Sequence, residues 1–358
     1  MAVLGPTASS VDALIGDFYA DPSGLCPSSG LDCVVTAGKA LAAANTGGST
    51  VVLSGVTMQG NDSSWGAALA SVAKSDAVVL ALGTDRSVAG EGNDRSDIGL
   101  PGLQTPFGLA VLAAAHAAGV PVILLLIHNL PCSFDELVQP ANATYTPVAA
   151  IVDAWAPTTH VAAVAAAMFG GANRWGRAVL TVYPRAYQDS ISLFSFDMSA
   201  APGRSYKYYG GPALVRFGEG LSYSSYGLAC SGGFTSADAS TITVDCVVRS
   251  VDGPDGDEVL LVLHRPSGET AAFVNGTHPL PLAALRDFAR VAVAAGGSAT
   301  VSFTLPTAQA LGLTNENGAQ VLYPGLHFLD VWNGNSQNVT IALQYPGPAT
   351  IVKSPPRP

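Results

Sequence analysis

The stretch from Asp76 to Gln104 reads DAVVLALGTDRSVAGEGNDRSDIGLPGLQ, and it decides the fold. An apolar run over 77–82 stops abruptly at Gly83, a charged loop follows, and LPGLQ opens an alanine-rich segment. A short apolar run without alternation is typical of a strand that is buried on both faces. In open sheets of parallel strands, ligands bind beyond the carboxyl ends of the strands. The loop after Gly83 is therefore the first candidate for a functional site.

Similar apolar runs recur along the first half of the chain, with alanine-rich stretches between them. The predicted strands are 2–5, 50–53, 77–82, 121–127, 149–154 and 178–182. The predicted helices are 36–44, 65–74, 104–118 and 160–169. Because strands and helices alternate, this part is expected to be α/β, with a mostly parallel sheet flanked by helices on each face, an αβα sandwich.

The composition changes after about Tyr226, where only strand patterns are found. The predicted strands there are 240–251, 258–265, 289–294, 299–305, 320–322, 327–332 and 338–344. Many short strands separated by Gly, Pro, Asn and Asp predict an all-β sandwich. We therefore expect an α/β domain over 1–226, a β-sandwich domain over 227–348 and a tail over 349–358, whose KSPPRP end is predicted to be disordered.

The charge balance excludes two classes of partner. The net charge is −10 with only 16 Lys and Arg, so no nucleic acid or anionic membrane surface is expected as a partner. The apolar segment 108–127 contains His116, Gly119 and Pro121 and divides into a helix and a strand, so no membrane span is predicted. Met1 leads directly into a predicted strand, and no signal peptide is recognised in this chain.

The five cysteines do not show the spacing of a metal site, and no CxxC occurs. Cys26 with Cys33 and Cys230 with Cys246 could each close a loop in an oxidising compartment, and buried thiols are the alternative. Four N-x-S/T sequons favour secretion only mildly, and they lie at Asn61, Asn142, Asn275 and Asn338.

The order G-x-D, E-G-x-D-R, L-P-G-x-Q resembles the second domain of family 3 glycoside hydrolases, in their β-xylosidase branch. It is carried by Gly83, Asp85, Glu91, Gly92, Asp94, Arg95, Leu100, Pro101, Gly102 and Gln104. Further matching segments follow in the family's order, at 2–6, 16–19, 151–155, 169–173 with 176–177, 197–198, 203–209, 217–223, 256–259, 285–291 and 323–325. The last three resemble the fibronectin III-like domain that ends many members. The resemblance implies the same α/β sandwich followed by a fibronectin III-like sandwich.

The resemblance also implies a chemistry, retaining hydrolysis of terminal β-linked sugars of xyloside or glucoside type. That reaction needs two carboxyl groups about 5–5.5 Å apart. Glu91, between two glycines, is the first candidate for the acid/base, and Asp85 is the second. In the family the nucleophile lies on a (β/α)8 barrel, which needs about 250 residues and which this chain does not include. We therefore expect little hydrolysis from the chain alone, and no metal or organic cofactor.

Other residues of the same loops are candidates for binding or support. Asp94 and Arg95 are expected to pair with each other or to brace the loop. Arg95, His128 and Trp155 are candidates for contact with a β-linked oligosaccharide or glycoside, although core packing is the ordinary role of a His or Trp beside buried strands. The remaining candidates have structural interpretations: Trp175 in a core, and Glu219 at the junction with the second domain.

Several positions depart from the family pattern. Residues 156–159, APTT, replace a Y-P-G-(Q/E) run, Asn129-Leu130 replaces a Gly-Gly pair, and Arg174-Trp175 replaces a Pro and a small residue. These departures lie in loops at the carboxyl ends of strands, where a substrate would bind. The barrel that this chain does not include leaves two alternatives open: a carbohydrate-binding protein without catalysis, and a chain that is completed by a barrel on another chain. A flavodoxin-like nucleotide-binding protein is disfavoured because no glycine-rich phosphate loop occurs. The family resemblance implies secretion to the cell exterior or the cell wall.

Overall fold

The computed structural model describes residues 1–16, 26–27, 30–139 and 145–354. The matching segment at 16–19 and the sequon at Asn142 therefore lie wholly or largely outside the described residues. The chain divides into two compact units, one of residues 1–172 and 182–189 and the other of residues 173–181 and 190–358. Each unit is described below by itself.

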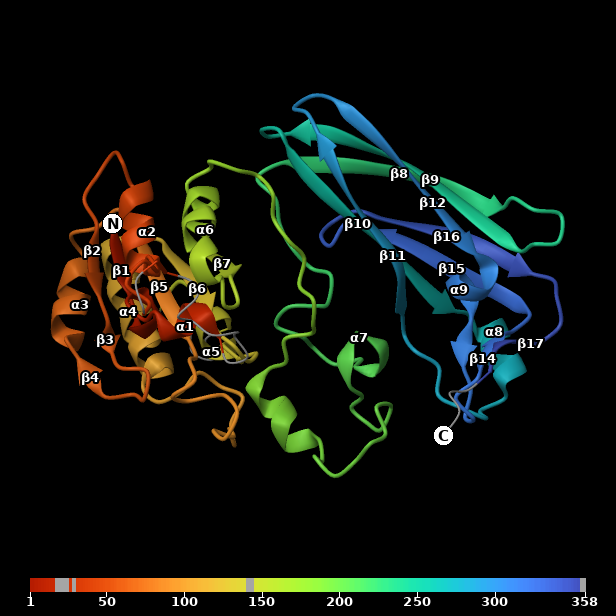
Figure 1. Cartoon of the computed structure of the whole chain (residues 1–358), viewed down its shortest axis with the longest axis horizontal. Helices are drawn as coiled ribbons and strands as arrows, with labels where there is room; N and C mark the ends of the chain where they lie inside the picture. The colour runs from red at the N-terminus through yellow and green to blue at the C-terminus, as the bar shows by residue number, and fades with distance from the viewer. Residues whose placement is uncertain (17–25, 28–29, 140–144, 355–358) are drawn as a thin grey trace. The chain divides into compact units, whose positions relative to one another are not determined.

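The first unit is built on five parallel strands (Figure 1). Their order in the sheet is β2-β1-β5-β6-β7. Their bounds are Ala2–Leu4 for β1, Val51–Leu53 for β2, Val78–Gly83 for β5, Val122–Ile127 for β6 and Ala150–Asp153 for β7. A small pair, β3 (Gly55–Val56) with β4 (Asp62–Ser63), accompanies them. All six residues of β5 are buried, which confirms that the non-alternating apolar run is a strand covered on both faces.

Helices cover both faces of this sheet. The helices are α1 (Asp12–Ile15), α2 (Ala37–Ala44), α3 (Trp65–Val72), α4 (Gln104–Ala118), α5 (Asp135–Val138) and α6 (Val161–Met168), with 3-10 turns η1 (Pro6–Ala8), η3 (Thr158–His160) and η4 (Arg185–Ser190). Val79 and Ala81 of β5 share a core with residues of α2 and α6. On the α4 side, Gly108 is in contact range of Leu80. Alternate residues of one strand thus face different helices, which confirms the αβα sandwich.

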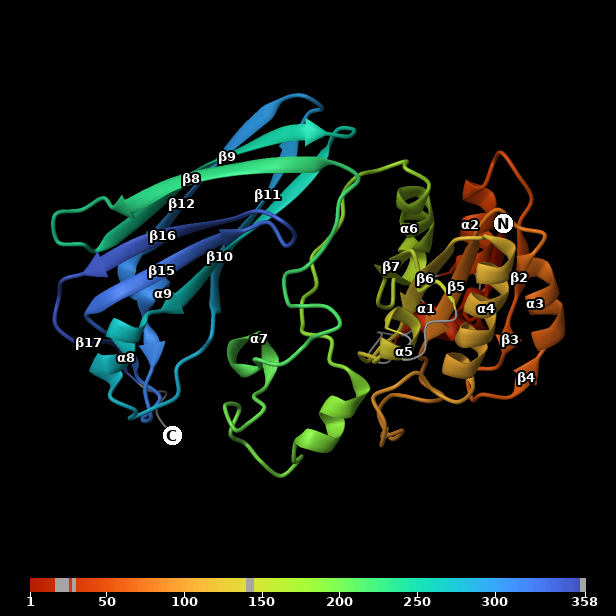
Figure 2. The same ribbon diagram turned by 180° about the vertical axis from the view of Figure 1, so that it is seen from behind.

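The second unit is a β-sandwich. One sheet has the strand order β11-β10-β15-β16, a second has β12-β9-β8, and a small third has β13-β14-β17 (Figures 1 and 2). Their bounds are Ser225–Phe234 for β8, Thr241–Asp252 for β9, Gly256–Pro266 for β10, Ala284–Val293 for β11, Ser298–Pro306 for β12, Leu313–Thr314 for β13, Gln320–Leu322 for β14, Gly325–Trp332 for β15, Asn338–Tyr345 for β16 and Thr350–Lys353 for β17. Every second residue of β15 is buried, as expected for a strand with one face in a core. The expected all-β sandwich is confirmed.

The structure corrects four details of the sequence analysis. Residues 178–182 form no strand, because Ala178 donates to the carbonyl of Glu219 and accepts from the amide of Gly218, outside any sheet. Strand β8 was not predicted. The second unit also contains short helices, α7 (Ser205–Tyr208), α8 (Gly268–Val274) and α9 (Thr307–Leu311). Residues 350–353 of the predicted tail are strand β17, which pairs with β14.

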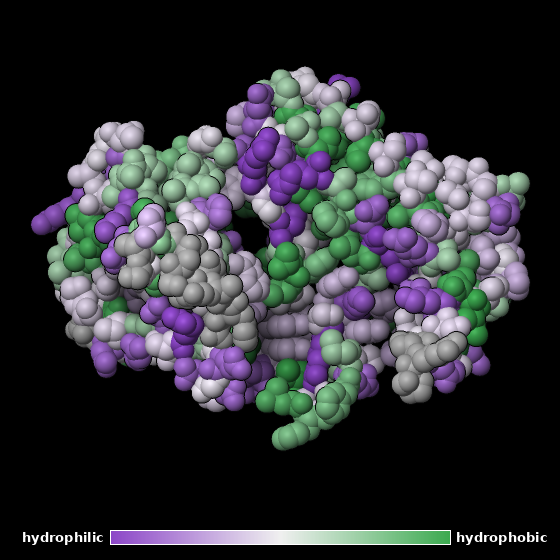
Figure 3. Space-filling model, in the orientation of Figure 1, coloured by the Kyte–Doolittle hydropathy of each residue, from purple (hydrophilic) through white to green (hydrophobic). Residues whose placement is uncertain are grey.

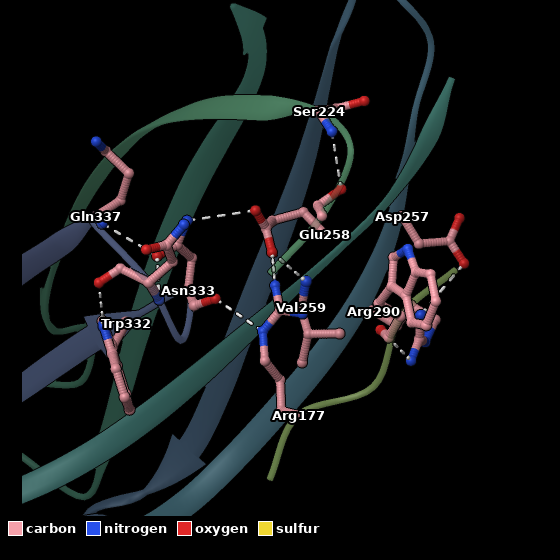
Figure 4. Close-up of polar contacts among 12 residues, drawn as sticks. Arg177, Ser224, Asp257, Glu258, Val259, Arg290, Trp332, Asn333 and Gln337 are labelled. Carbon is pink, nitrogen blue, oxygen red and sulfur yellow. Dashed lines mark hydrogen bonds and ion pairs between the residues drawn. The ribbon is translucent and has the colours of Figure 1, made fainter. Parts of the chain in front are cut away.

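A buried ion pair fixes the segment 173–181 to the β-sandwich (Figure 4). The guanidinium of Arg177 contacts the carboxylate of Glu258, and their side chains are 6% and 3% exposed. Asn333 completes the cluster, because its carbonyl accepts from Arg177 Nε at 2.9 Å and its amide lies 3.3 Å from Glu258 Oε2. Burial raises the pKa of Glu258, and the contact with Arg177 opposes that rise. Two residues of separate family-like segments are therefore partners in one structural cluster.

Candidate active site

The loop that carries the catalytic candidates is closed by a buried glutamine. Gln104 is fully buried, and its side-chain amide accepts from the Gly83 N–H and donates to the Gly83 carbonyl, both at 2.9 Å. Gly83 has a φ of 145°, and a Cβ at this position would lie 1.8 Å from the carbonyl oxygen of Ile127. The two ends of the loop, Gly83 at the end of β5 and Gln104 at the start of α4, are therefore hydrogen-bonded to each other. Gln104 is the final residue of the L-P-G-x-Q motif.

Asp85 forms the first turn of this loop. Its side chain is largely buried, and Oδ1 accepts from the Ser87 amide at 2.9 Å and the Ser87 hydroxyl at 2.6 Å. The backbone amides of Val88 and Ala89 donate to its carbonyl at 3.2 and 3.0 Å. An aspartate that bonds the backbone two residues on is a frequent way to start a turn. The contacts of Asp85 in the structure are those of a residue that shapes the loop.

Glu91 stands at the tip of the loop. Asn93 donates its backbone N–H to the carbonyl of Gly90 at 2.9 Å, so residues 90–93 form a tight turn with Glu91 in its second position. Gly92 follows with a φ of 80°, a value that type II turns require at the third position and that glycine adopts without steric cost. The side-chain amide of Asn93 anchors the turn by donating to the carbonyl of Arg86 at 2.7 Å. Glu91 is therefore an exposed carboxylate on an anchored turn.

A polar bridge joins this loop to the end of the next strand. The hydroxyl of Thr84 donates to the Asn129 side-chain oxygen at 2.6 Å and accepts from the backbone N–H of Asn129 at 3.2 Å. The Asn129 side chain also donates to the carbonyl of Ala89. In sequence, Asn129 stands out only because Asn129-Leu130 replaces a Gly-Gly pair of the family pattern. Its side chain holds the β5 and β6 loops together, a role that the sequence alone did not reveal.

Arg95 and Asp97 brace the second half of the loop. The Arg95 guanidinium donates to the carbonyl of Gly99 and lies 3.4 Å from Cys132 Sγ. Asp97 accepts from the Gly99 amide at 2.7 Å and forms an ion pair with Arg185. Partial burial would raise the pKa of Asp97, but the Gly99 N–H and the Arg185 guanidinium outweigh it and lower that pKa. These contacts agree with the expected bracing role of Arg95, and Arg185 is a partner that sequence spacing could not identify.

Arg95, Asp97 and Arg185 are among the residues that line a pocket of about 470 Å³, and Glu91 and Asp85 are not in its lining. It is lined by Val88, Asp94, Arg95, Ser96, Asp97, Gly99, Leu100, Pro101, Gly102, Thr105, Pro106, Glu136 and Arg185. The volume lies within the range of about 300–1,000 Å³ that is usual for small-molecule sites. The pocket therefore has polar and charged side chains from the candidate loop on its wall.

His128 and Trp155 lie together at the ends of β6 and β7. His128 is almost fully buried, its Nε2 is 2.9 Å from a carboxylate oxygen of Asp153, and its ring centroid is 4.9 Å from that of Trp155. Because a carboxylate accepts, His128 Nε2 carries the proton in this contact. Trp155 has a φ of 51° and keeps 36% of its surface exposed. Asp153 thus joins the two predicted binding residues, and only Trp155 has a substantial exposed surface.

The other candidates lie in the second unit. Trp175 packs edge-on against Tyr223 with ring centroids 5.7 Å apart, and Glu219 pairs with Arg216 at 3.5 Å. Among the residues that the structure describes, no group of three or more His, Cys, Asp or Glu side chains could hold a metal ion. In the same residues no helix has the length and apolar character to cross a membrane.

Both predicted cysteine pairs are disulfides, Cys26–Cys33 and Cys230–Cys246. The second joins residues that are direct cross-strand partners on β8 and β9. Cys132 is a buried free thiol whose pKa is raised by burial. The structure therefore supports the disulfide interpretation over buried thiols for four of the five cysteines.

Comparison with known proteins identifies the family. Residues 1–223 match the Glycosyl hydrolase family 3 C-terminal domain, and residues 271–342 match the Fibronectin type III-like domain. The chain belongs to glycosyl hydrolase family 3, of which it contains the C-terminal domain. The family resemblance that was drawn from the loop motif is thus confirmed.

The relatives are longer proteins. "Probable beta-D-xylosidase 7" of Arabidopsis thaliana is 28% identical over 361 residues, which span 92% of this chain and 44% of the relative. A beta-xylosidase of Formosa agariphila is 28% identical across 74% of this chain and 34% of its own length. The chain therefore spans less than half the length of these curated relatives.

Solved structures share the fold. A GH3 exo-beta-xylosidase (XlnD), solved in complex with a xylobiose aziridine activity-based probe, matches 99% of this chain and 46% of its own with a TM-score of 0.81 at 20% identity. The beta-glucosidase of Listeria innocua in complex with glucose matches 98% of this chain and 46% of its own, with a TM-score of 0.73 at 21% identity. At these identities the match concerns the fold.

Proposed function

We propose that this chain is the C-terminal part of a retaining β-xylosidase or β-glucosidase, and that Glu91 is its acid/base. The observation that carries the proposal is the position of Glu91 on an anchored turn, in a loop at the carboxyl end of β5, within a family 3 domain. An acid/base group must reach the glycosidic oxygen of a bound sugar. An exposed carboxylate on a turn with glycine neighbours meets that requirement. The Asp85 carboxylate accepts two hydrogen bonds from Ser87.

The nucleophile of the pair would come from a barrel domain, in the same polypeptide or in a partner chain. Exposed apolar side chains support this part of the proposal. Leu193, Phe194 and Phe196 are each about nine-tenths exposed, and hydrophobic atoms protrude at the lower edge of the view in Figure 3. Exposed apolar patches often mark surfaces that contact another protein part. We accordingly expect the chain alone to bind or hydrolyse β-linked sugars weakly at most.

The substrate is proposed to be a β-linked oligosaccharide or glycoside with a terminal xylose or glucose, by analogy with the beta-xylosidase and beta-glucosidase relatives. Trp155 would supply an apolar surface to the sugar and Arg95 a cation at the pocket wall. The two disulfides support an oxidising location, so we propose that the protein is secreted.

The test compares substrates with good and poor leaving groups, using the chain joined to its barrel domain. A 2,4-dinitrophenyl β-xyloside needs no proton for departure, whereas an alkyl β-xyloside does. Glu91→Ala should therefore lower kcat/KM on the alkyl xyloside by about 10²–10⁴-fold. On the dinitrophenyl xyloside, formation of the glycosyl-enzyme should be slowed far less. Added azide should restore turnover of the activated substrate, because it attacks the glycosyl-enzyme without a general base.

Asp85→Asn and Asp94→Asn are the matched controls, since each removes one carboxylate from the same loop. Neither should show azide rescue. If Asp85→Asn gives the leaving-group dependence and Glu91→Ala does not, the acid/base assignment belongs to Asp85. This chain alone could also turn over aryl xyloside, with Glu91→Gln abolishing that turnover. The chain would then hold its own nucleophile, and the proposal that the nucleophile comes from a barrel domain would be wrong.

A further inference from the structure

A second pocket lies in the β-sandwich unit, apart from the candidate active-site loop. It has a volume of about 380 Å³ and is lined by Leu285, Arg286, Pro306, Ala308, Gln309, Gln320, Val352 and Lys353. These residues come from β11, β12, α9, β14 and β17, and Figure 1 shows α9, β14 and β17 near one another in this unit. The charged side chains among them, Arg286 and Lys353, are both cationic. In a chain with 26 acidic and 16 basic residues, a pocket wall with two cations and no carboxylate is unusual.

Arg286 is a half-buried cation without a carboxylate partner. No ion pair of Arg286 occurs within the described part of the chain, whereas the buried Arg177 has Glu258 as its partner. Its Nη2 donates to the carbonyl of Gly312 at 2.7 Å and to His264 Nδ1 at 3.0 Å, and its Nε is buried without a hydrogen-bond partner. A guanidinium stays protonated in proteins, so the charge persists. An uncompensated charge of this kind is costly unless an anion completes it.

Two histidines hold this guanidinium in place. His264 and His327 are fully buried, and their rings are joined by an Nε2 to Nδ1 contact of 2.9 Å. Because Arg286 can only donate, His264 Nδ1 accepts, so its Nε2 donates to His327, whose own Nε2 donates to the carbonyl of Tyr323 at 2.9 Å. Every ring nitrogen is thereby used, and the imidazoles are neutral. These hydrogen bonds orient the Arg286 guanidinium, but the neutral imidazoles do not compensate its positive charge.

We propose that this pocket binds a small carboxylate, of the size of an acidic monosaccharide, through Arg286 and Lys353. Both hydrogens of Arg286 Nη2 are used by Gly312 and His264 and Nε is buried, so Nη1 is the group of this guanidinium that can donate to a carboxylate oxygen. The lysine adds a second positive charge. The side-chain amides of Gln309 and Gln320 lie on the same wall and can bond hydroxyl groups. The pocket volume is at the small end of the range of about 300–1,000 Å³ for ligand sites, which favours a ligand of one sugar ring. The site is independent of the proposed hydrolytic function.

The test is a calorimetric titration of the whole chain with sodium glucuronate and with glucose, which differ in one carboxylate. We expect saturable binding of glucuronate, no binding of glucose, and weakening as chloride is raised from 20 to roughly 200 mM. Lys353→Gln lies at an exposed position and should weaken glucuronate binding by at least about fivefold, the loss of one charge-assisted contact. Lys74→Gln removes the same charge from an exposed helix end of the α/β unit and should leave binding unchanged.

Arg286→Gln should abolish glucuronate binding. Because Arg286 also bonds Gly312, circular dichroism checks that the Arg286→Gln variant is folded. If Arg286→Gln does not fold, the Lys353→Gln result still tests the proposal. Equal binding of acetate, sulfate and glucuronate would mean an adventitious ion only. Binding of glucose as tight as that of glucuronate, or an unchanged affinity in Lys353→Gln, would overturn the proposal.

Discussion

Thr158 has a backbone conformation that its side chain disfavours. Its φ is 51°, in the left-handed region, where a β-branched residue is a genuine outlier. Thr158 belongs to the segment 156–159, which stands in place of the Y-P-G-(Q/E) run in the family resemblance. Trp155 nearby is also left-handed, at a φ of 51°.

Thr158→Gly should accordingly stabilise the α/β unit by about 0.5–1 kcal/mol, since relief of the left-handed strain exceeds the entropy that glycine adds to the unfolded chain. Thr159→Gly is the matched control, because its φ is not positive, and it should destabilise by a similar amount. Urea unfolding of both variants measures the difference. A loss of stability in Thr158→Gly would show that the left-handed turn is not strained.

At the scale of single elements, the loop after β5 depends on Gln104 more than on any motif carboxylate. Gln104→Leu leaves the N–H and the carbonyl of Gly83 buried without partners, and each unmade bond costs about 1–3 kcal/mol. We expect a loss of about 2–4 kcal/mol in the free energy of unfolding, together with faster proteolysis within 84–103. Gln59→Leu, at an exposed position, should cost less than about 0.5 kcal/mol.

The ion pair of Arg177 and Glu258 gives a second prediction at this scale. Arg177→Met should cost about 3–5 kcal/mol, because it leaves the Glu258 carboxylate buried without its cation. The double variant Arg177→Met/Glu258→Gln should recover part of that loss, since neither charge remains. For comparison, Arg216→Met removes the exposed pair with Glu219 and should cost at most about 1 kcal/mol. If the double variant is no more stable than Arg177→Met, an uncompensated charge is not the cause.

Elements with strong periodicity could be predicted from the sequence, and those defined by partners could not. Residue types alone predict which positions are buried in the run 77–82 and in the alternating strands β9 and β15. Strand β8, SYGLACSGGF, contains three glycines, which disfavour a strand, although Tyr226, Leu228, Cys230 and Phe234 alternate toward the core. Pairing with β9 along its length fixes it as a strand. Helix α8 is short, but Ser267 before it accepts from the amides of Glu269 and Thr270, a capping signal that could have been recognised.

The same distinction applies to the candidate site. The motif located the loop and its residues Asp85, Glu91 and Arg95. It could not give the contacts of Asn129 with Thr84 and of Arg185 with Asp97, because these partners are far apart in the chain and are brought together only by the fold. Contacts that depend on tertiary structure leave no local pattern in the sequence.

At the scale of the whole molecule, stability should fall at mildly acidic pH because of the β-sandwich unit. Burial lowers the pKa of His264 and of His327, and the Arg286 charge lowers both further. Each folded pKa is then below the unfolded value of about 6.5, so the unfolded chain binds more protons in that window. The stabilisation is complete above about pH 6.5 and is lost as the pH falls, with a limiting slope of about 1.4 kcal/mol per pH unit for each histidine.

Hydrogen exchange of the β10 and β15 amides between pH 7 and pH 5, corrected for intrinsic rates, measures this loss. His264→Gln should reduce the slope, and His160→Gln, at an exposed position, should not change it. A pH-independent opening free energy would contradict the assignment of neutral, buried imidazoles.

Strand β17 has a consequence for any shortened form of the protein. Its partner β14 lies between β13 and β17, so both edges of β14 are covered while residues 350–353 are present. A polypeptide that ends at residue 348, where the sequence alone would place the end of the sandwich, leaves one edge of β14 with unpaired N–H and carbonyl groups. Unpaired edges attract strands from other molecules. We therefore expect a chain that ends at residue 348 to self-associate more than one that includes strand β17.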